Sequence, residues 1–442
     1  MPIHDSRPSY RQLSHFFVPL ALMSMSQALT YPLVAMVASR GEGGALNMAG
    51  LAQSNTFMFF LGSIAAGLVT AGMAYGKGIE GFARFRRVNG IMMLVVGCLH
   101  AFFALPGPSH LVFGVIMGLK PSIEAPARLT FIACLPLHLL FFLRNPYHVA
   151  LFNARRTVRA YVATLGRIVL TAALSPLFCT IGLVGPLWAV VCLTVPLLLE
   201  IAVSWLLARS LIARLEPDRE TVASVGEILR FSLTLSVGTV FLSMSGYVMG
   251  AFVARAPEPE RVLPAAYLAL GLVTPVNFGA SRVQALVVSF GGERNAVGRL
   301  WRFTLMAGVV LGVIPLVFQI PGVRELYYVS LQKLPPADLA LVTTTAFGMV
   351  FAPLTVAFRS LCQGRAAFVR RPEIVLGGQG IYLGIMTSTA FIALQAGAPG
   401  SLLIPIALLS GNVVSAGAMM LMLGRHWHDA PVPLVQPVLP ER

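Results

Sequence analysis

The sequence predicts an all-α integral membrane protein with twelve transmembrane helices in two six-helix lobes, related by a pseudo-two-fold axis along the membrane normal. Three observations predict this class. Apolar residues make up 57% of the 442 residues and charged residues only 11%, whereas soluble domains carry about 25% charged residues. Long apolar runs recur along the chain, and one polar stretch near the midpoint separates them into two sets of six. This composition excludes a soluble enzyme, a disordered protein and a nucleic-acid-binding module.

Twelve apolar runs approach the length of about 20 residues that a bilayer core requires. The first run follows Arg7 and Arg11 as a signal peptide would, but it is far longer than a signal peptide's apolar region, so we expect a retained helix. Segment 109–119 is too short to span and predicts a loop helix. The expected spans are 13–39, 48–75, 88–106, 127–150, 158–181, 183–208, 228–254, 264–290, 300–320, 336–361, 374–395 and 401–424.

The most polar internal stretch, 209–227, holds four of the 17 acidic residues and predicts a connector on the cytoplasmic side. It divides the chain into an N-terminal six-helix lobe, 1–208, and a C-terminal six-helix lobe, 228–428. The last segment, 429–442, contains four prolines and predicts a disordered tail, because proline-rich segments do not pack into a core.

The two halves contain similar short stretches in the same order. Such repeats are typical of transporters, whose parallel repeats are related by an axis along the membrane normal. The alternative is coincidence, since apolar sequence produces chance matches. The matches are Ser24–Ser26 with Ser243–Ser245, Leu51-Ala52 and Gly62-Ser63 with Leu268-Ala269 and Gly279-Ala280, and Leu151–Arg155 with Leu361–Arg365, at offsets of 219, 217 and 210 residues.

The basic residues predict the orientation of the chain. The net charge is +15. We attribute this charge to an excess of Lys and Arg in cytoplasmic loops, and not to nucleic-acid binding. If the N-terminus is inside, 23 basic residues lie in inside segments and 7 in outside segments. This split predicts a plasma or inner membrane protein with both termini in the cytoplasm.

The five cysteines lie singly in apolar stretches and predict neither disulfides nor a zinc site.

Polar residues inside predicted spans are the candidate substrate site, because such groups are costly in lipid and usually face a cavity or a partner. We expect seven of them to line a central cavity between the lobes that binds an anionic group. Packing between helices is the alternative role for the hydroxyl and amide residues. The seven residues are Gln27, Gln53, Asn55, Asn277, Ser281, Arg282 and Gln284.

Arg282 is the most informative of these residues. It lies in the later half of the eighth span, where insertion of an arginine costs about 2.5–3.5 kcal/mol at the helix centre. Its partner is an anionic substrate, a backbone carbonyl or an acid; alternatively, the span ends before Arg282. Glu200 in the sixth span is the one clearly intramembrane acid, and Arg167 in the fifth span competes for it.

Three residues are candidates for proton coupling: His138, His100 and Glu200. Histidine titrates near neutral pH, so one that faces a cavity can relay protons. His138 follows Pro136 within the fourth span and is the best placed of the histidines. The alternative is that each histidine is a packed, hydrogen-bonded core residue.

No phosphate-binding loop, no HExxH motif and no GxSxG motif occurs in the sequence. We therefore expect neither an enzyme nor a resident cofactor or metal. The partners that remain are the lipid bilayer, a small solute and a coupling proton or sodium ion.

Twelve spans in two halves, the connector, and polar first, second, seventh and eighth helices together resemble the multidrug/oligosaccharidyl-lipid/polysaccharide (MOP) exporter superfamily, which includes the MATE transporters. Some stretches also resemble its progressive ankylosis branch, which transports pyrophosphate and citrate. The resemblance implies a V-shaped pair of lobes with a substrate cavity between them. The stretches are Phe16–Leu20, Phe131–Leu137, Thr274–Val276, Gln284–Phe290 and Pro353–Val356.

The function that we expect is export of a small anionic or polar solute by secondary active transport with alternating access. The resemblance implies a membrane carboxylate in the first or seventh helix of a cation-expelling MATE protein, and neither helix has one here. The alternatives are a flippase for a lipid-linked sugar or polysaccharide precursor, MATE-type multidrug efflux, and a membrane scaffold without transport.

Overall fold

The computed structural model describes residues 8–28, 30–154, 156–218, 222–291, 296–369 and 371–424. Within this part of the chain every regular element is helical, and twelve helical segments are long and apolar enough to cross a membrane. Each overlaps one predicted span, so the predicted class of a multi-pass, all-α membrane protein is confirmed. The predicted tail, 429–442, lies outside the described residues.

The first half of the chain builds six spans. α1 and α2 form the first span and α3 and α4 the second, while α6 and η1 are the short helices expected near 109–119. The elements are α1 (Tyr10–Ala28), α2 (Thr30–Ala38), α3 (Ala45–Ser63), α4 (Leu68–Tyr75), α5 (Ile79–Ala104), α6 (Pro106–His110), η1 (Leu111–Ile116), α7 (Pro121–Asn153), α8 (Thr157–Thr180) and α9 (Pro186–Ile212).

The second half builds the other six spans in a similar order. Counted along the whole chain, the eighth span consists of α11 and α12, and the tenth span consists of η4, α14 and α15. The elements are α10 (Val225–Ala254), α11 (Pro259–Ser281), α12 (Val283–Phe290), α13 (Ala296–Val313), η2 (Ile314–Gln319), η3 (Glu325–Leu331), η4 (Pro336–Asp338), α14 (Leu339–Gly348), α15 (Ala352–Phe368), α16 (Pro372–Gln395) and α17 (Gly400–Leu423).

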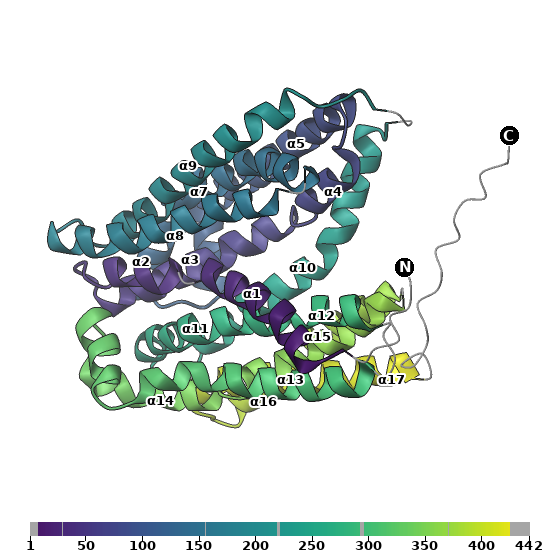
Figure 1. The fold of residues 1–442 in the computed structure, drawn as a ribbon. Coiled ribbons are helices and arrows are strands. Elements are labelled where there is room, and N and C mark those ends of the chain that lie inside the picture. The colour runs from purple at the N-terminus through teal and green to yellow at the C-terminus, as the bar shows by residue number, and fades with distance from the viewer. Residues whose placement is uncertain are drawn as a thin grey trace, which may run out of the picture.

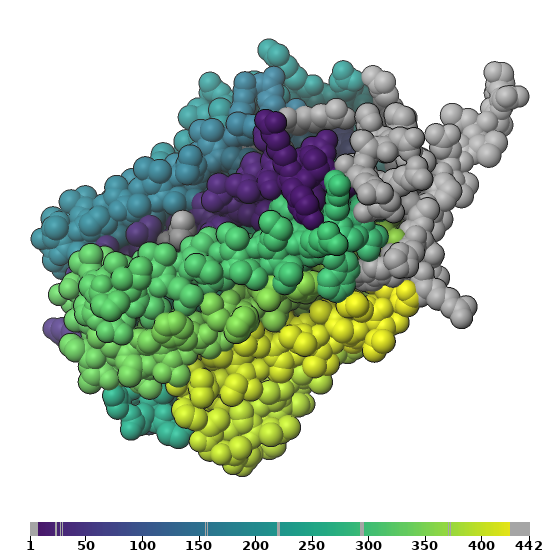
Figure 2. Space-filling model, turned by 60° about the horizontal axis from the view of Figure 1, so that its bottom comes forward, coloured from purple at the N-terminus to yellow at the C-terminus, as the bar shows by residue number. Residues whose placement is uncertain are grey.

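The helices divide into two lobes, and the first helix of each half, α1 or α10, lies between them (Figure 1). We call α2–α9 the N-lobe and α11–α17 the C-lobe. Leu13 and Phe17 of α1 share an apolar core with Val276 of α11, in the C-lobe. Ile228 of α10 shares a core with Leu68 of the N-lobe, whereas Met249, later in α10, belongs to a core that reaches α16 of the C-lobe. α1 accordingly lies between the lobes and is visible there as the purple helix in Figure 2.

The connector is fixed to the N-lobe. Asp218 Oδ2 accepts hydrogen bonds from the backbone N–H groups of Glu80 (2.9 Å) and Gly81 (3.0 Å) in the first turn of α5. The first turn of a helix has unpaired N–H groups and a favourable dipole for a carboxylate. Ser224 and Glu227 then form a reciprocal cap that begins α10.

The lobes meet at the end of the molecule where α2 and α14 lie, which we call the closed end (Figure 1). Ala35 and Met48 of the N-lobe pack there against Leu268, Tyr328 and Val342 of the C-lobe. This apolar layer lies beneath loops that the count of basic residues assigns to the outside.

Polar contacts join the same loops across the lobes. Lys120 Nζ lies 3.3 Å from Glu260 Oε2, and Ser122 donates a hydrogen bond to the other oxygen of Glu260. Arg40 Nη1 donates to the carbonyl of Leu331 at 2.6 Å. At the opposite end, where Tyr10 and Leu423 lie, the ribbons of the lobes diverge (Figure 1).

Candidate substrate site

Arg282 lies at the junction of α11 and α12, with its side chain exposed. Its Nε donates a hydrogen bond to Ser24 Oγ of α1, and Ser24 Oγ donates to the carbonyl of Leu20 at 2.9 Å. Tyr161 of α8, in the N-lobe, lies within electrostatic range of the guanidinium. Among the described residues no carboxylate forms an ion pair with Arg282. The structure therefore places an unpaired cation where α1 and both lobes approach one another.

Three predicted site residues share this part of the C-lobe. Asn277, Ser281 and Gln284 recur at helical spacing around the junction of α11 and α12. Asn277 Oδ1 is buried without a hydrogen-bond partner among the described residues. Ser281 Oγ donates to the carbonyl of Phe278 at 2.7 Å, and the backbone of Gln284 lies against Gly364 of α15. The junction thus offers amide and hydroxyl groups beside the guanidinium.

The other predicted residues lie elsewhere. Gln53 of α3 is buried, and its Oε1 lies against Gly250 of α10. Asn55 is buried inside the N-lobe, where its Oδ1 accepts a contact from Cys134 Sγ at 4.0 Å. The side chain of Gln27 is outside the described part of the chain. The structure therefore brings four of the seven residues to one junction and places Gln53 and Asn55 on the N-lobe side.

His100 and His138 form a buried pair that joins α5 to α7. Their Nδ1 atoms lie 2.9 Å apart, and His100 Nε2 lies 2.8 Å from the carbonyl of Phe131. A carbonyl accepts only, so His100 Nε2 carries a proton, and a neutral His100 then accepts at Nδ1 from His138. The ring of His100 also stacks on Phe131, with centroids 3.9 Å apart. This geometry fixes both tautomers and fits the packed role that sequence reasoning kept as the alternative.

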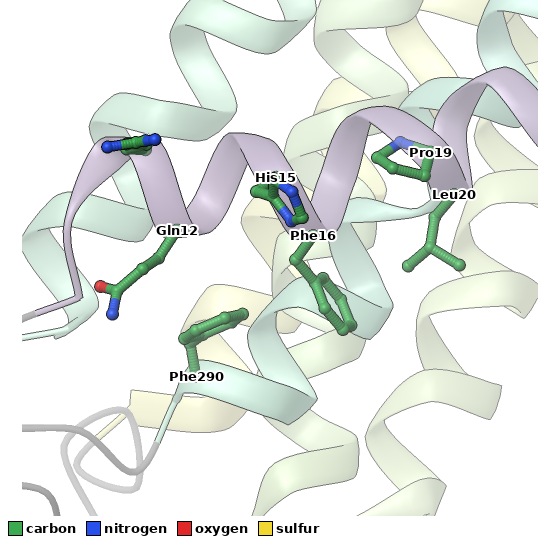
Figure 3. Close-up of a pocket in the computed structure, with 7 residues that line it drawn as sticks. Gln12, His15, Phe16, Pro19, Leu20 and Phe290 are labelled. Atoms are coloured by element: carbon green, nitrogen blue, oxygen red, sulfur yellow. The ribbon is translucent and has the colours of Figure 1, made fainter.

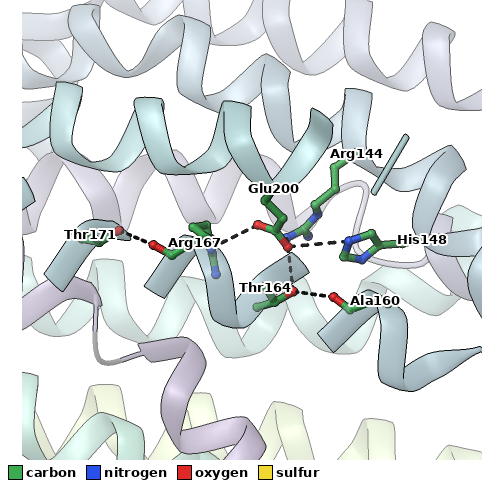
Figure 4. Close-up of polar contacts among 7 residues, drawn as sticks. All are labelled: Arg144, His148, Ala160, Thr164, Arg167, Thr171 and Glu200. Atoms are coloured by element: carbon green, nitrogen blue, oxygen red, sulfur yellow. Dashed lines mark hydrogen bonds and ion pairs between the residues drawn. The ribbon is translucent and has the colours of Figure 1, made fainter. Parts of the chain in front are cut away.

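Glu200 lies at the centre of a polar cluster inside the N-lobe (Figure 4). It is fully buried, and its carboxylate lies 3.2 Å from Arg144 Nη1, 3.1 Å from Arg167 Nε and 3.6 Å from His148 Nε2. Thr164 Oγ1 donates to the same carboxylate at 2.7 Å. The expected pairing of Arg167 with Glu200 is present. One carboxylate faces two guanidinium groups, so the cluster carries a net positive charge.

The predicted spans 127–150 and 336–361 include Arg144 and Arg359, but the count of basic residues assigned both arginines to the cytoplasmic edges of those spans. Arg359 of α15 is 7% exposed and lies over the ring of Tyr382, 4.4 Å from its centroid. A signal for a buried role existed, because each arginine lies inside a predicted apolar run rather than beyond its end.

A cavity of about 840 Å³ opens beside α1 at the end opposite the closed end (Figure 3). Phe16 of α1 and Phe290 of α12 face each other there, with ring centroids 5.4 Å apart. Arg11, Gln12 and His15 give the cavity a basic and polar edge. A space with an aromatic lining and cationic groups suits an amphipathic anion.

Comparisons with known proteins give likenesses of structure only. No family model and no curated protein matches the sequence. The inward-facing conformation of a multidrug resistance MATE transporter of the MOP superfamily is 16% identical, with 94% of this chain and 98% of that chain covered and a TM-score of 0.72.

Two further solved structures are similar over most of their length. The lipid II flippase MurJ in its inward closed conformation is 13% identical, over 93% of this chain and 87% of that chain, with a TM-score of 0.66. A MOP superfamily transporter from Pyrococcus furiosus, described by the reversed polarity of its binding pocket, is 16% identical over 96% of each chain, with a TM-score of 0.61. The protein thus has the fold of the MATE transporters and of MurJ.

Proposed function

We propose that the protein is a secondary active transporter that exports a small anionic or polar solute by alternating access between its two lobes. The observation that carries this proposal is Arg282, an exposed guanidinium at the junction of α1, α11 and α12 without a carboxylate partner among the described residues. A substrate carboxylate or phosphate would supply the missing charge through charge-assisted hydrogen bonds.

The proposed site centres on Arg282, with Asn277, Ser281 and Gln284 beside it. Gln27 follows Ser24 by one helical turn of α1 and belongs to the same proposal, whereas Gln53 and Asn55 would contribute from the N-lobe. When the lobes rock, the junction would face the opposite side of the membrane.

The conformation fits the step in which solute enters from the cytoplasm. The contacts of Arg40, Lys120 and Glu260 close the end that the basic-residue count assigns to the outside. This orientation, with both termini inside a plasma or inner membrane, is part of the proposal. The similarity to an inward-facing MATE structure supports the assignment of this conformation to the step of cytoplasmic entry.

Flipping of a lipid-linked sugar or polysaccharide precursor is the second candidate function. The cavity beside α1 favours it, because Phe16 and Phe290 offer an apolar surface and Arg11 and His15 a basic edge. The likeness to the lipid II flippase also supports it. Only the fold supports MATE-type multidrug efflux. The resemblance to the ankylosis branch remains a hypothesis that the transported anion is pyrophosphate or citrate.

The test is efflux from proteoliposomes loaded with small polyanions such as pyrophosphate or citrate, with proton and sodium gradients applied separately. We expect Arg282→Gln to abolish anion efflux or to reduce it at least tenfold, since a hydrogen bond to a charged group contributes about 1.5–3 kcal/mol. Arg302→Gln is the matched control, because it removes the same charge from an exposed position on α13.

Wild-type efflux rates in a well-folded Arg282→Gln variant would contradict the proposal. Movement of a lipid-linked sugar without movement of soluble anions would select the flippase instead. A rate that responds to the proton gradient would direct further variants to His100, His138 and Glu200, the coupling candidates.

A further inference from the structure

A second, smaller cavity lies inside the N-lobe and is separate from the junction at Arg282. It measures about 10 Å³ and is enclosed by residues of α2, α3, α7, α8 and α9. A cavity of this size takes one guest of about the size of a water molecule. Its polar lining comes from Thr30 and Tyr31 of α2, Asn55 of α3, and Arg167 and Thr171 of α8.

This lining offers mainly hydrogen-bond donors. Asn55 is 4% exposed, its Oδ1 is already used by Cys134, and its Nδ2 is buried without a partner among the described residues. Arg167 has donors only, and the phenol of Tyr31 can donate. Thr171 Oγ1 donates to the backbone of Arg167 at 2.9 Å, which fixes that side of the cavity. Among the described residues that line the cavity, none is acidic.

The charge next to the cavity is positive. Arg167 contacts the cavity and also lies 3.1 Å from Glu200, whose carboxylate is shared with Arg144. The side chains of Arg144 and Arg167 are only 22% and 13% exposed. Unbalanced charge is costly at membrane depth, so an excess of one buried cation calls for a further anion. Thr164 and His148, the other neighbours of Glu200, add no negative charge.

We infer that the cavity between Tyr31, Asn55 and Arg167 binds a small monovalent anion of about the size of chloride. The anion accepts hydrogen bonds from these donors and balances the second guanidinium of the Glu200 cluster. The volume excludes carboxylates, phosphates and sugars, so the guest is not the transported solute. Because Tyr31 belongs to α2 and Arg167 to α8, a bound anion fastens the second part of the first span to the N-lobe.

The test uses the purified full-length protein in detergent. Its thermal unfolding is followed by tryptophan fluorescence while sodium chloride is replaced by sodium gluconate at constant ionic strength. Chloride should raise the unfolding midpoint in a saturable way, and gluconate, which is too large for the cavity, should not. Bromide should replace chloride and should produce an anomalous scattering peak beside Arg167 in crystals.

Two variants locate the effect. Asn55→Asp places a tethered carboxylate in the cavity without a change of shape and should abolish the chloride dependence. Tyr31→Phe removes one hydroxyl donor and should raise the half-saturating chloride concentration roughly tenfold. Asn89→Asp is the matched control, because Asn89 is equally buried but donates to the carbonyl of Phe142 and does not line the cavity.

Equal stability in chloride and gluconate, with no bromide peak, would overturn the inference and leave water as the occupant. Chloride dependence that persists in Asn55→Asp would also overturn it, because the anion would then bind elsewhere. The inference does not depend on transport: Arg282→Gln should keep the chloride dependence even where it abolishes efflux.

Discussion

At the scale of single residues, Glu200 organises the interior of the N-lobe. Its carboxylate joins three helices, because Arg144 comes from α7, Thr164 and Arg167 from α8, and Glu200 itself from α9. A buried ion pair contributes little net stability compared with apolar packing, but removal of one partner leaves an uncompensated buried charge. The carboxylate is therefore more important to stability than either arginine alone.

Glu200→Gln is expected to lower the free energy of unfolding by about 3 kcal/mol or more, because two buried guanidinium groups lose their shared counter-charge. Thermal unfolding in detergent measures this change. Glu80→Gln is the control: Glu80 pairs with Arg84 on an exposed surface of α5 and is 67% exposed, so its loss should have little effect. A Glu200→Gln variant as stable as the wild type would show that the cluster is not a charge-balanced unit.

Sequence reasoning reached part of this residue chemistry. It recognised Glu200 as an acid inside the membrane and Arg167 as its possible partner, since both lie within apolar runs. It did not name Arg144 as a partner of Glu200, because it counted this arginine at the cytoplasmic edge of the predicted span 127–150. The helix continues past that point, and α7 reaches Asn153. It also grouped Gln53 and Asn55 with Arg282, although linear spacing cannot show that Gln53 faces α10 and that Asn55 is buried inside the N-lobe.

At the scale of elements, α10 approaches the N-lobe closely at Gly67, just before α4. A Cβ atom at Gly67 would lie 2.2 Å from the carbonyl oxygen of Ser232 in α10. The backbone N–H of Gly67 also donates to Ser236 Oγ at 3.0 Å. A side chain at this position would therefore push two helices apart.

Gly67→Ala should destabilise the protein by about 1–3 kcal/mol, as overpacking in a closely packed site does. The matched control is Gly238→Ala in α10, where no atom lies within 4 Å of the added Cβ. That change should be neutral or should stabilise the helix by about 0.5–1 kcal/mol. Unfolding midpoints of the two variants, measured side by side, test the contact; equal midpoints would contradict it.

Element boundaries were less predictable than element number. Four long helices begin at a proline, namely α7, α9, α11 and α16. Proline at the first helical position loses no hydrogen bond. The predicted fourth span begins at 127 rather than at Pro121 because Glu124 interrupts the apolar pattern just before it, as Arg128 does just inside it. Those two residues pair with each other at 3.4 Å on α7.

At the scale of the whole molecule, the closed end decides which side the lobes face. An apolar layer that includes Ala35 and Tyr328 lies beneath the polar contacts of Arg40, Lys120 and Glu260. A ligand shifts such an equilibrium only by its difference in affinity for the two states. Changes in the polar contacts should therefore change the populations without any ligand.

Glu260→Gln should increase the fraction of molecules open at this end roughly two- to fivefold, since an exposed ion pair contributes up to about 1 kcal/mol. Spin labels at positions 42 and 323, one in each lobe, would report the fraction as a longer distance in pulsed electron resonance. Glu325→Gln serves as the control, because Glu325 bonds to Arg324 and Gly322 within its own loop. An unchanged distance distribution in Glu260→Gln would show that the apolar layer alone keeps this end closed.

α1 of the first half packs on the C-lobe and α10 of the second half packs in part on the N-lobe, so the two halves resemble a partly swapped dimer fused into one chain. Each half completes part of the apolar core of the other, so the peptide link between them should be dispensable. Fragments 1–218 and 222–442, coexpressed as separate polypeptides, are expected to copurify through an affinity tag on one of them. Recovery of the tagged fragment alone would show that α1 and α10 cannot hold the halves together without a covalent connection.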